Sequence, residues 1–278
     1  MKRKKTTKNI GNLAGKILLF GGVYSNLQSL QKIMEIAKNK NITSHNIICT
    51  GDVVAYCAQP EEVVQTVKDW NIHSIAGNVE IQLREGLEDC GCDFRDGSRC
   101  DIFSKEWYPY AQEKLSASSI EWMDNLPDFI EFDFAGKKCG VVHGSYFETS
   151  GYIFQSTDWE KKSKNFEVAQ ADIIIGGHCG LPFSQKNQDK LWLNPGVIGM
   201  PANDGTTRVW YMILDLDHQE EIFYTHLPYQ YDHIKAANLM AENKLTPAYE
   251  KTLRTGIWDN CEILPEQETR LQGQLIVF

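Results

Sequence analysis

Residues 46–52, with the sequence NIICTGD, combine a short apolar run with a glycine and an aspartate that follow it. This pattern is typical of a buried strand that ends in a tight polar turn. The same pattern occurs on both sides, at residues 16–22 (KILLFGG) and at residues 72–78 (IHSIAGN). We therefore predict three buried strands, each with a polar turn at its carboxyl end.

Two helices are predicted between these strands. Asn26 can cap a helix whose apolar residues recur at helical spacing from Leu27 to Ala37. Pro60 begins a second helix, with Glu61 and Glu62 near the positive end of the helix dipole. The order strand–helix–strand–helix–strand predicts parallel strands covered by helices.

The rest of the chain continues to alternate between strands and helices. We predict strands over residues 129–134, 138–142, 172–175, 190–193, 208–215 and 220–226, and helices over residues 103–115, 118–126, 229–241 and 247–254. The expected organisation is a basic flexible tail over residues 1–15 and a single domain over residues 16–278. That domain carries a cysteine-containing insertion near residues 86–102 and a helical extension near residues 229–278.

The composition is that of an ordinary globular protein. The 278 residues include 42% hydrophobic and 23% charged side chains, with 28 basic against 37 acidic residues and a net charge of −9. The body of the chain offers no basic face for duplex nucleic acid, so no such partner is expected. No apolar run approaches about eighteen residues, so no membrane partner is expected either. Eight cysteines without a secretory signal indicate a reducing compartment, and we expect a cytoplasmic protein.

Four polar side chains follow predicted strands at the point where each strand ends. They are Asp52, Asn78, His143 and His178, each beside a glycine. Ligands of open α/β sheets bind beyond the carboxyl ends of the strands, so these side chains are expected to converge. A carboxylate, an amide and two imidazoles suit manganese, iron or zinc.

The order of these motifs resembles the calcineurin-like metallophosphoesterase superfamily from about residue 16 to residue 226. The sequences NPG at 194–196 and GMP at 199–201 reinforce the resemblance, and GGVYSN and PANDGT loosely resemble an uncharacterised bacterial branch. The resemblance implies a four-layer α/β/β/α sandwich with two metal ions at the strand ends. It also implies hydrolysis of phosphoesters by a metal-activated water.

The chain departs from the family pattern at four positions. Gly22 and Tyr24 replace the aspartate and histidine of the first motif, and Gly180 replaces the last histidine of the fifth motif. Val79 stands where the family has its catalytic histidine. By the resemblance, one metal loses three of its four ligands.

The other metal keeps its full ligand set, which by the resemblance is Asp52, Asn78, His143 and His178. We therefore expect one divalent ion (Mn, Fe or Zn) rather than none.

The predicted function is phosphoester hydrolysis at this reduced site, on a phosphate-containing small molecule. Asp52 is the one anionic ligand left, and Tyr24 is the candidate replacement acid unless it is only a packed aromatic ring. The alternative is a non-catalytic protein that binds a ligand or regulates a partner. The sequence does not indicate an oligomeric state.

Three cysteines raise a separate possibility. Cys90, Cys92 and Cys100 lie within eleven positions and could hold zinc with a fourth ligand from elsewhere. Their C-x-C-x7-C spacing is not that of a standard zinc ribbon, which favours unlinked thiols. Cys57 and Cys179 lie in predicted site loops, where they could support other metal chemistry or only pack.

Overall fold

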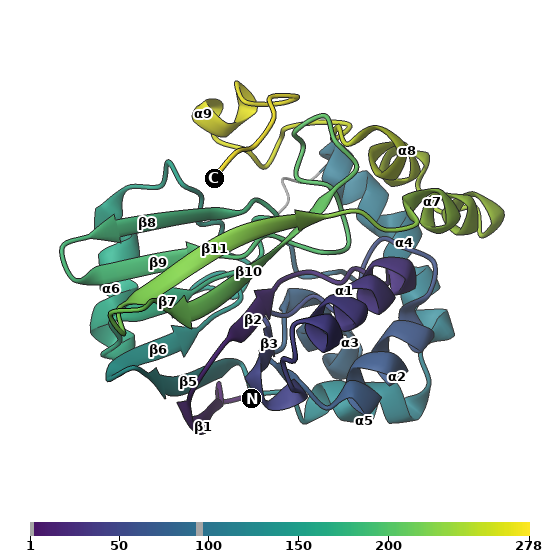
Figure 1. Ribbon diagram of the computed structural model, residues 1–278. Helices are drawn as coiled ribbons and strands as arrows, with labels where there is room; N and C mark the ends of the chain where they lie inside the picture. Colours follow the sequence, from purple (N-terminus) through teal and green to yellow (C-terminus); the bar gives the residue numbers. More distant parts are fainter. Residues whose placement is uncertain (1–2, 93–96) are drawn as a thin grey trace.

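The computed structural model describes residues 3–92 and 97–278, and its two β-sheets lie face to face between layers of helices (Figure 1). The first sheet has the order β11-β10-β2-β3-β4. Its strands are β2 (Ile17–Phe20), β3 (Ile47–Cys49), β4 (His73–Ser74), β10 (Val209–Leu216) and β11 (Ile222–Tyr229). As expected, β2, β3 and β4 are parallel, and β10 pairs antiparallel with both β2 and β11.

The second sheet has the order β1-β5-β6-β7-β9-β8. Its strands are β1 (Thr7–Leu13), β5 (Phe129–Phe134), β6 (Lys137–Val141), β7 (Ile173–Ile175), β8 (Phe183–Asn187) and β9 (Lys190–Asn194). The predicted hairpin is present as β5 and β6, while β6, β7 and β9 run parallel. The carboxyl ends of β3, β6 and β7 therefore lead to one edge of the molecule.

The helices cover the outer faces of the two sheets. The helices are α1 (Leu27–Asn39), α2 (Pro60–Trp70), α3 (Asn78–Glu85), α4 (Arg99–Lys114), α5 (Ala117–Asp124), α6 (Trp159–Ala169), α7 (His233–Glu242), α8 (Pro247–Thr255) and α9 (Glu266–Thr269), with a short 3-10 turn at Ser44–Asn46. Helix α6 packs on the second sheet through Phe166 against Trp192, while α1 to α5 and α7 and α8 pack on the first. This is the predicted α/β/β/α sandwich.

One apolar core lies between the two sheets. Leu19 and Ile48 of the first sheet and Ile130 and Val141 of the second are fully buried in one apolar cluster. Such burial contributes roughly 1.5–3 kcal/mol for each large apolar side chain. This core fixes the two sheets against each other and so fixes the relative positions of the strand ends.

Helices α3 and α6 and strand β8 were not predicted, and two further segments differ from the sequence-based expectations. Thr7–Leu13 is a strand that pairs in parallel with β5, so these residues are not the flexible tail expected over residues 1–15. The sequence of this segment is polar because only Leu13 is fully buried. Backbone pairing with β5 holds the segment in the sheet. Helix α4 begins at Arg99, inside the expected insertion. Residues 1–2 of the tail and 93–96 of the insertion lie outside the described residues.

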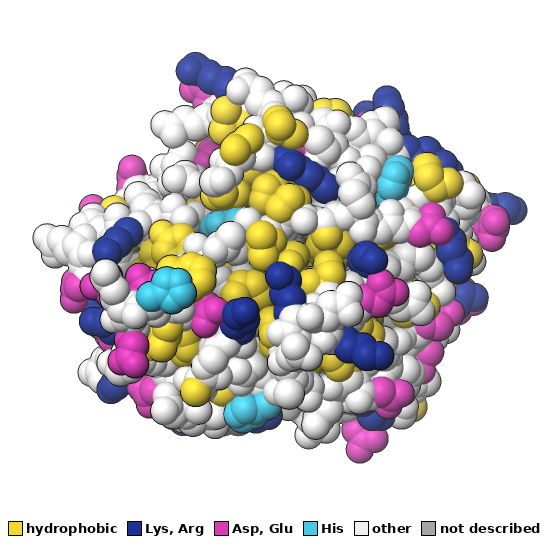
Figure 2. Space-filling model, in the orientation of Figure 1, with side chains coloured by type: hydrophobic (Ala, Val, Ile, Leu, Met, Phe, Trp, Pro, Cys, Tyr) yellow, Lys and Arg dark blue, Asp and Glu magenta, His cyan; other side chains and the backbone are white. Residues whose placement is uncertain are grey.

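The surface seen in Figure 2 carries basic and acidic side chains intermixed, with hydrophobic side chains exposed between them. Nothing on this face gathers into a basic patch. No described helix is both long and apolar enough to cross a membrane.

Candidate metal centre

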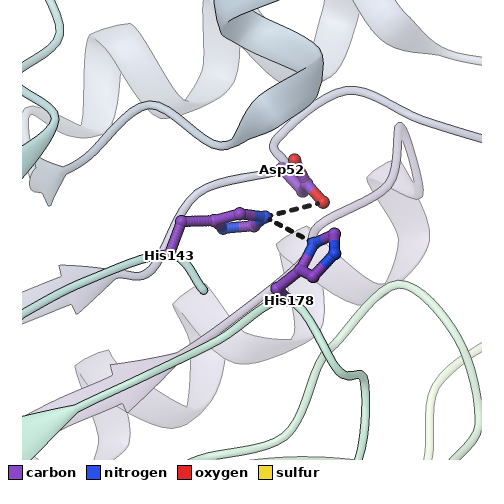
Figure 3. Close-up of side chains that lie close together, drawn as sticks. All are labelled: Asp52, His143 and His178. Carbon is purple, nitrogen blue, oxygen red and sulfur yellow. Dashed lines mark hydrogen bonds and ion pairs between the residues drawn. The ribbon is translucent and has the colours of Figure 1, made fainter. Parts of the chain in front are cut away.

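Asp52, Asn78, His143 and His178 meet at the common edge of the two sheets, and Figure 3 shows three of them pointing toward one another. Asp52 follows β3, Asn78 is the first residue of α3, His143 follows β6 and His178 follows β7. All four are buried. The first sheet thus contributes the two oxygen ligands and the second sheet contributes the two imidazoles.

The ligand atoms surround the Nε2 atom of His143. This nitrogen lies 3.2 Å from Asp52 Oδ2 and 3.1 Å from Asn78 Oδ1. It also lies 3.0 Å from His178 Nδ1. Two nitrogens and two oxygens at this spacing form a compact donor set that fits a divalent ion of the zinc, iron or manganese type.

Neighbouring groups aim the ligand atoms inward. His143 Nδ1 donates a hydrogen bond of 2.7 Å to the Thr50 carbonyl oxygen, which leaves Nε2 free to face the site. The Asn78 amide nitrogen donates to the Cys90 carbonyl at 2.8 Å and to Cys92 Sγ at 3.2 Å, so its oxygen faces the site. Several electron-pair donors therefore converge, and a bound cation would neutralise their mutual repulsion.

The pKa shifts differ between the two imidazoles and the carboxylate. Burial opposes charge on His143, but Asp52, the Thr50 carbonyl and Glu80 together outweigh burial and raise the pKa of His143. Burial and the neighbouring His143 lower the pKa of His178 to about 3, so His178 is neutral and able to ligate at ordinary pH. Burial alone would raise the pKa of Asp52, but His143 lowers it, so this carboxylate stays ionised.

Glu80 holds the two oxygen-bearing loops together. Its buried carboxylate accepts backbone N–H groups from Asp52 at 2.9 Å, Val54 at 3.0 Å and Gly77 at 2.8 Å. Burial and the nearby Asp52 raise the pKa of Glu80 to about 7. These contacts stabilise Asp52 in a left-handed backbone conformation, φ +54°, which is costly for a residue with a side chain.

Two glycines allow the loops to approach this closely. A Cβ atom on Gly77 would lie 2.9 Å from Asp52 Cγ, and one on Gly51 would lie 2.9 Å from His143 Nδ1. Gly51 also has φ +94°, a conformation that favours glycine. The glycines next to the ligands are therefore required by the geometry of the site.

Aromatic rings lie over two of the substituted positions. A Cβ atom on Gly22 would lie 2.7 and 2.8 Å from Cε1 and Cε2 of Tyr24, and one on Gly180 would lie 3.3 Å from the Trp258 ring. Val79 is buried and apolar. Burial and then Asp52 raise the pKa of Tyr24 well above its usual value, so its hydroxyl keeps its proton.

The tight contact at Gly22 gives a stability prediction. Gly22→Ala should lower the free energy of unfolding by about 3 kcal/mol, because the new methyl group overlaps the Tyr24 ring and φ is positive. Gly136→Ala is the matched control, since φ is also positive there but no atom lies within 4 Å. It should cost only about 1 kcal/mol. Equal losses in urea-denaturation experiments would show that Tyr24 does not fill this space.

The cysteines of the insertion contact different residues. Cys92 accepts a hydrogen bond from Asn78, whereas Cys100 donates toward Asn260 Oδ1 at 3.6 Å. Among the described residues, the cluster able to offer three such ligands is Asp52, His143 and His178, and no cysteine joins it. Cys57 and Cys179 are buried, and Cys179 Sγ accepts from Asn194 at 3.2 Å.

This arrangement predicts that the insertion is not needed for metal binding. A triple serine variant of Cys90, Cys92 and Cys100 should keep the wild-type metal content, because a serine hydroxyl can still accept from Asn78. Elemental analysis of the purified variant checks this. Loss of one equivalent that is independent of His178 would instead reveal a zinc site in the insertion.

Sequence reasoning missed several residues around the site. Glu80 is one of them, because its hydrogen bonds to the two oxygen-bearing loops depend on the tertiary fold. Tyr152 packs on His178 with ring centroids 4.5 Å apart, and Tyr56 packs on Tyr24 at 4.8 Å. Neither tyrosine stands out by spacing or by neighbouring residues, so no sequence signal could have found it.

Comparisons with known proteins agree with the architecture. The domain model of the calcineurin-like phosphoesterase superfamily matches residues 16–219, and the chain belongs to this superfamily. An uncharacterized protein from Methanocaldococcus jannaschii is 27% identical over 245 residues, covering 82% of this chain and 93% of its own.

Two solved structures share the fold. A metallophosphoesterase from Sphaerobacter thermophilus is 22% identical with a TM-score of 0.69, covering 88% of this chain and 100% of its own. A hypothetical protein from Pyrococcus horikoshii OT3 is 17% identical with a TM-score of 0.70, covering 87% and 99%. At these identities the likeness concerns the fold.

Proposed function

We propose that this chain is a phosphoester hydrolase that uses one divalent metal ion, held by Asp52, Asn78, His143 and His178. The observation that carries the proposal is the convergence of the other three ligand atoms within 3.2 Å of His143 Nε2. The Tyr24 and Trp258 rings occupy the space beside Gly22 and Gly180, which supports a single ion rather than a pair.

The chain's own residues have limited roles in the chemistry. When bound, a single divalent ion polarises a phosphoryl oxygen and lowers the pKa of a water molecule. Asp52 supplies the negative charge that retains the ion. Tyr24 lines the adjacent cleft, and its protonated hydroxyl is suited to donate a hydrogen bond to the phosphate. Val79 cannot protonate a leaving group, so we expect slow turnover of generic phosphoesters.

A second candidate function is ligand binding without turnover. It is favoured by the same substitutions, because an apolar Val79 and the packed Tyr24 ring remove the acid and the second ion on which family enzymes rely. This function keeps the metal site and the cleft but needs no reaction.

Metal titration of a hydrolysis assay separates the two functions. With Mn²⁺ added to metal-free protein and a chromogenic phosphodiester as substrate, the rate should rise and level off at one ion per chain. A rate that requires two ions would contradict the one-metal proposal. Stoichiometric metal binding without any metal-dependent rate would support the binding function.

A further inference from the structure

A cleft lined by aromatic rings opens beside the metal ligands. Asp52 and His178 lie on its lining, and the aromatic residues Tyr24, Tyr56, Phe103, Tyr152, Tyr249 and Trp258 form much of the remaining wall. A phosphate bound at the metal centre would direct one of its ester groups into this cleft. The chemistry of the wall therefore bears on which ester group is accepted.

The wall is built largely by segments outside the two sheets. Phe103 belongs to α4, Tyr249 belongs to α8, and Trp258 lies in the loop that follows α8. Tyr249 and Trp258 also lie beyond residue 219, where the match to the superfamily domain ends. These rings are features of this chain's C-terminal extension.

Polar contacts join α4 to the C-terminal extension across the cleft. The Arg99 side chain donates to Asp259 at 2.6 Å, and its backbone N–H donates to Glu262 at 2.9 Å. The Trp258 indole nitrogen donates to the Pro201 carbonyl at 2.8 Å, which fixes the orientation of the ring. The extension is thus tied to the core near the site.

The rings support one another in fixed positions. Tyr56 packs against Tyr249 with centroids 4.4 Å apart, and Phe103 packs edge-on against Tyr249 at 5.5 Å. Rings that are already ordered offer stacking surface to a flat ligand at little further cost in conformational entropy. This favours a planar aromatic group over a small alkyl group.

The charges of the lining restrict the phosphate. Among the described residues that line the cleft, Asp52 and Asp259 are acidic and none is a lysine or arginine. Burial raises the pKa of the Cys100 thiol to about 11, so this thiol is neutral. Asp259 is paired with Arg99, so a divalent ion with Asp52 would leave one net positive charge, which matches a phosphodiester monoanion better than a polyphosphate.

We propose that this cleft binds the organic group of a phosphodiester and selects a planar aromatic ester group. The inference rests on the proposed function, since the metal centre is taken to bind the phosphate. An aryl ring and a nucleobase share the chemistry that the cleft recognises. Selection should then depend on Tyr249 and Trp258, neither of which is a proposed metal ligand.

Calorimetric titration of the metal-loaded protein tests this with two slowly hydrolysed monoanions, diphenyl phosphate and dimethyl phosphate. Diphenyl phosphate should bind at least about tenfold more tightly, as expected for added aromatic stacking. Tyr249→Leu should remove most of this preference and Tyr249→Phe should retain it, with metal content unchanged in both. Phe223→Leu, an exposed residue of β11 outside the cleft, is the matched control and should keep the preference.

The outcomes separate this inference from the proposed function. Equal affinity for the two diesters, a preference unchanged in Tyr249→Leu, or no binding of either diester would overturn the inference. If bis(4-nitrophenyl) phosphate is not hydrolysed while diphenyl phosphate is still preferred, the hydrolase fails and the aromatic site stands. A thymidine 5′-phosphodiester that binds more tightly than diphenyl phosphate would identify a nucleobase as the preferred form of the aromatic group.

Discussion

Alanine in place of His143 is expected to abolish metal binding. His143 Nε2 is the atom around which the other three ligand atoms gather, at 3.0 to 3.2 Å. Loss of a group that only orients a ligand already weakens metal affinity by about 10- to 100-fold. Removal of the central imidazole should exceed that range, and the variant should emerge from dialysis without metal while the wild type keeps one ion.

Two further variants make this result interpretable. His178→Ala removes a ligand from a different loop and should also lose the ion. Loss of the ion in both variants would then not be explained by a folding defect specific to His143→Ala. His218→Ala, in the exposed turn between β10 and β11, should keep the wild-type content. Retention of a full equivalent in folded His143→Ala would show that the ion binds elsewhere.

Asp52→Asn is expected to remove whatever hydrolysis the wild type shows. Asp52 is the one carboxylate among the four proposed ligands, and His143 holds its pKa low so that it stays ionised. Loss of a single oriented electrostatic group commonly slows an enzyme by about a hundredfold or more. Here the substitution removes the charge that retains the ion, so the rate should fall to background.

The measurement is hydrolysis of bis(4-nitrophenyl) phosphate with Mn²⁺, by proteins purified side by side. Asp189→Asn, an exposed carboxylate in the turn between β8 and β9, is the matched control and should match the wild type. Equal traces of activity in wild type and Asp52→Asn would mean contamination and would favour the binding function. Brisk wild-type turnover that Asp52→Asn abolishes would establish a fast one-metal enzyme, contrary to the slow rate expected here.

The individual strands were predictable because they leave strong local signals, whereas the four-layer sandwich was implied by the resemblance to the superfamily. Residues 46–52 show both the buried strand and the aspartate at its end, and the same pattern recurs wherever a ligand was predicted. Strand β1 was not predictable in this way, because Thr7–Leu13 is largely exposed and depends on pairing with a strand more than a hundred residues away. Edge strand β8 was missed because it is polar and only partly buried, although it pairs with the adjacent strand β9.

The convergence of the four candidate ligands was predictable from the sequence, but their surroundings were not. Asp52, Asn78, His143 and His178 follow strands, so topology alone places them at one edge. The contacts of Glu80 with the loop after β3 and the packing of Trp258 over Gly180 join residues that are distant in the sequence. Such contacts depend on the assembled fold, which periodicity and motif spacing do not describe.

The central claim is that one ion occupies this edge of the molecule. An anomalous-scattering map of crystals of the purified protein, combined with elemental analysis, locates each metal and identifies its element. The account predicts a single peak among the side chains of Asp52, Asn78, His143 and His178, with at most one equivalent per chain. Two peaks a few ångströms apart at this site would contradict it.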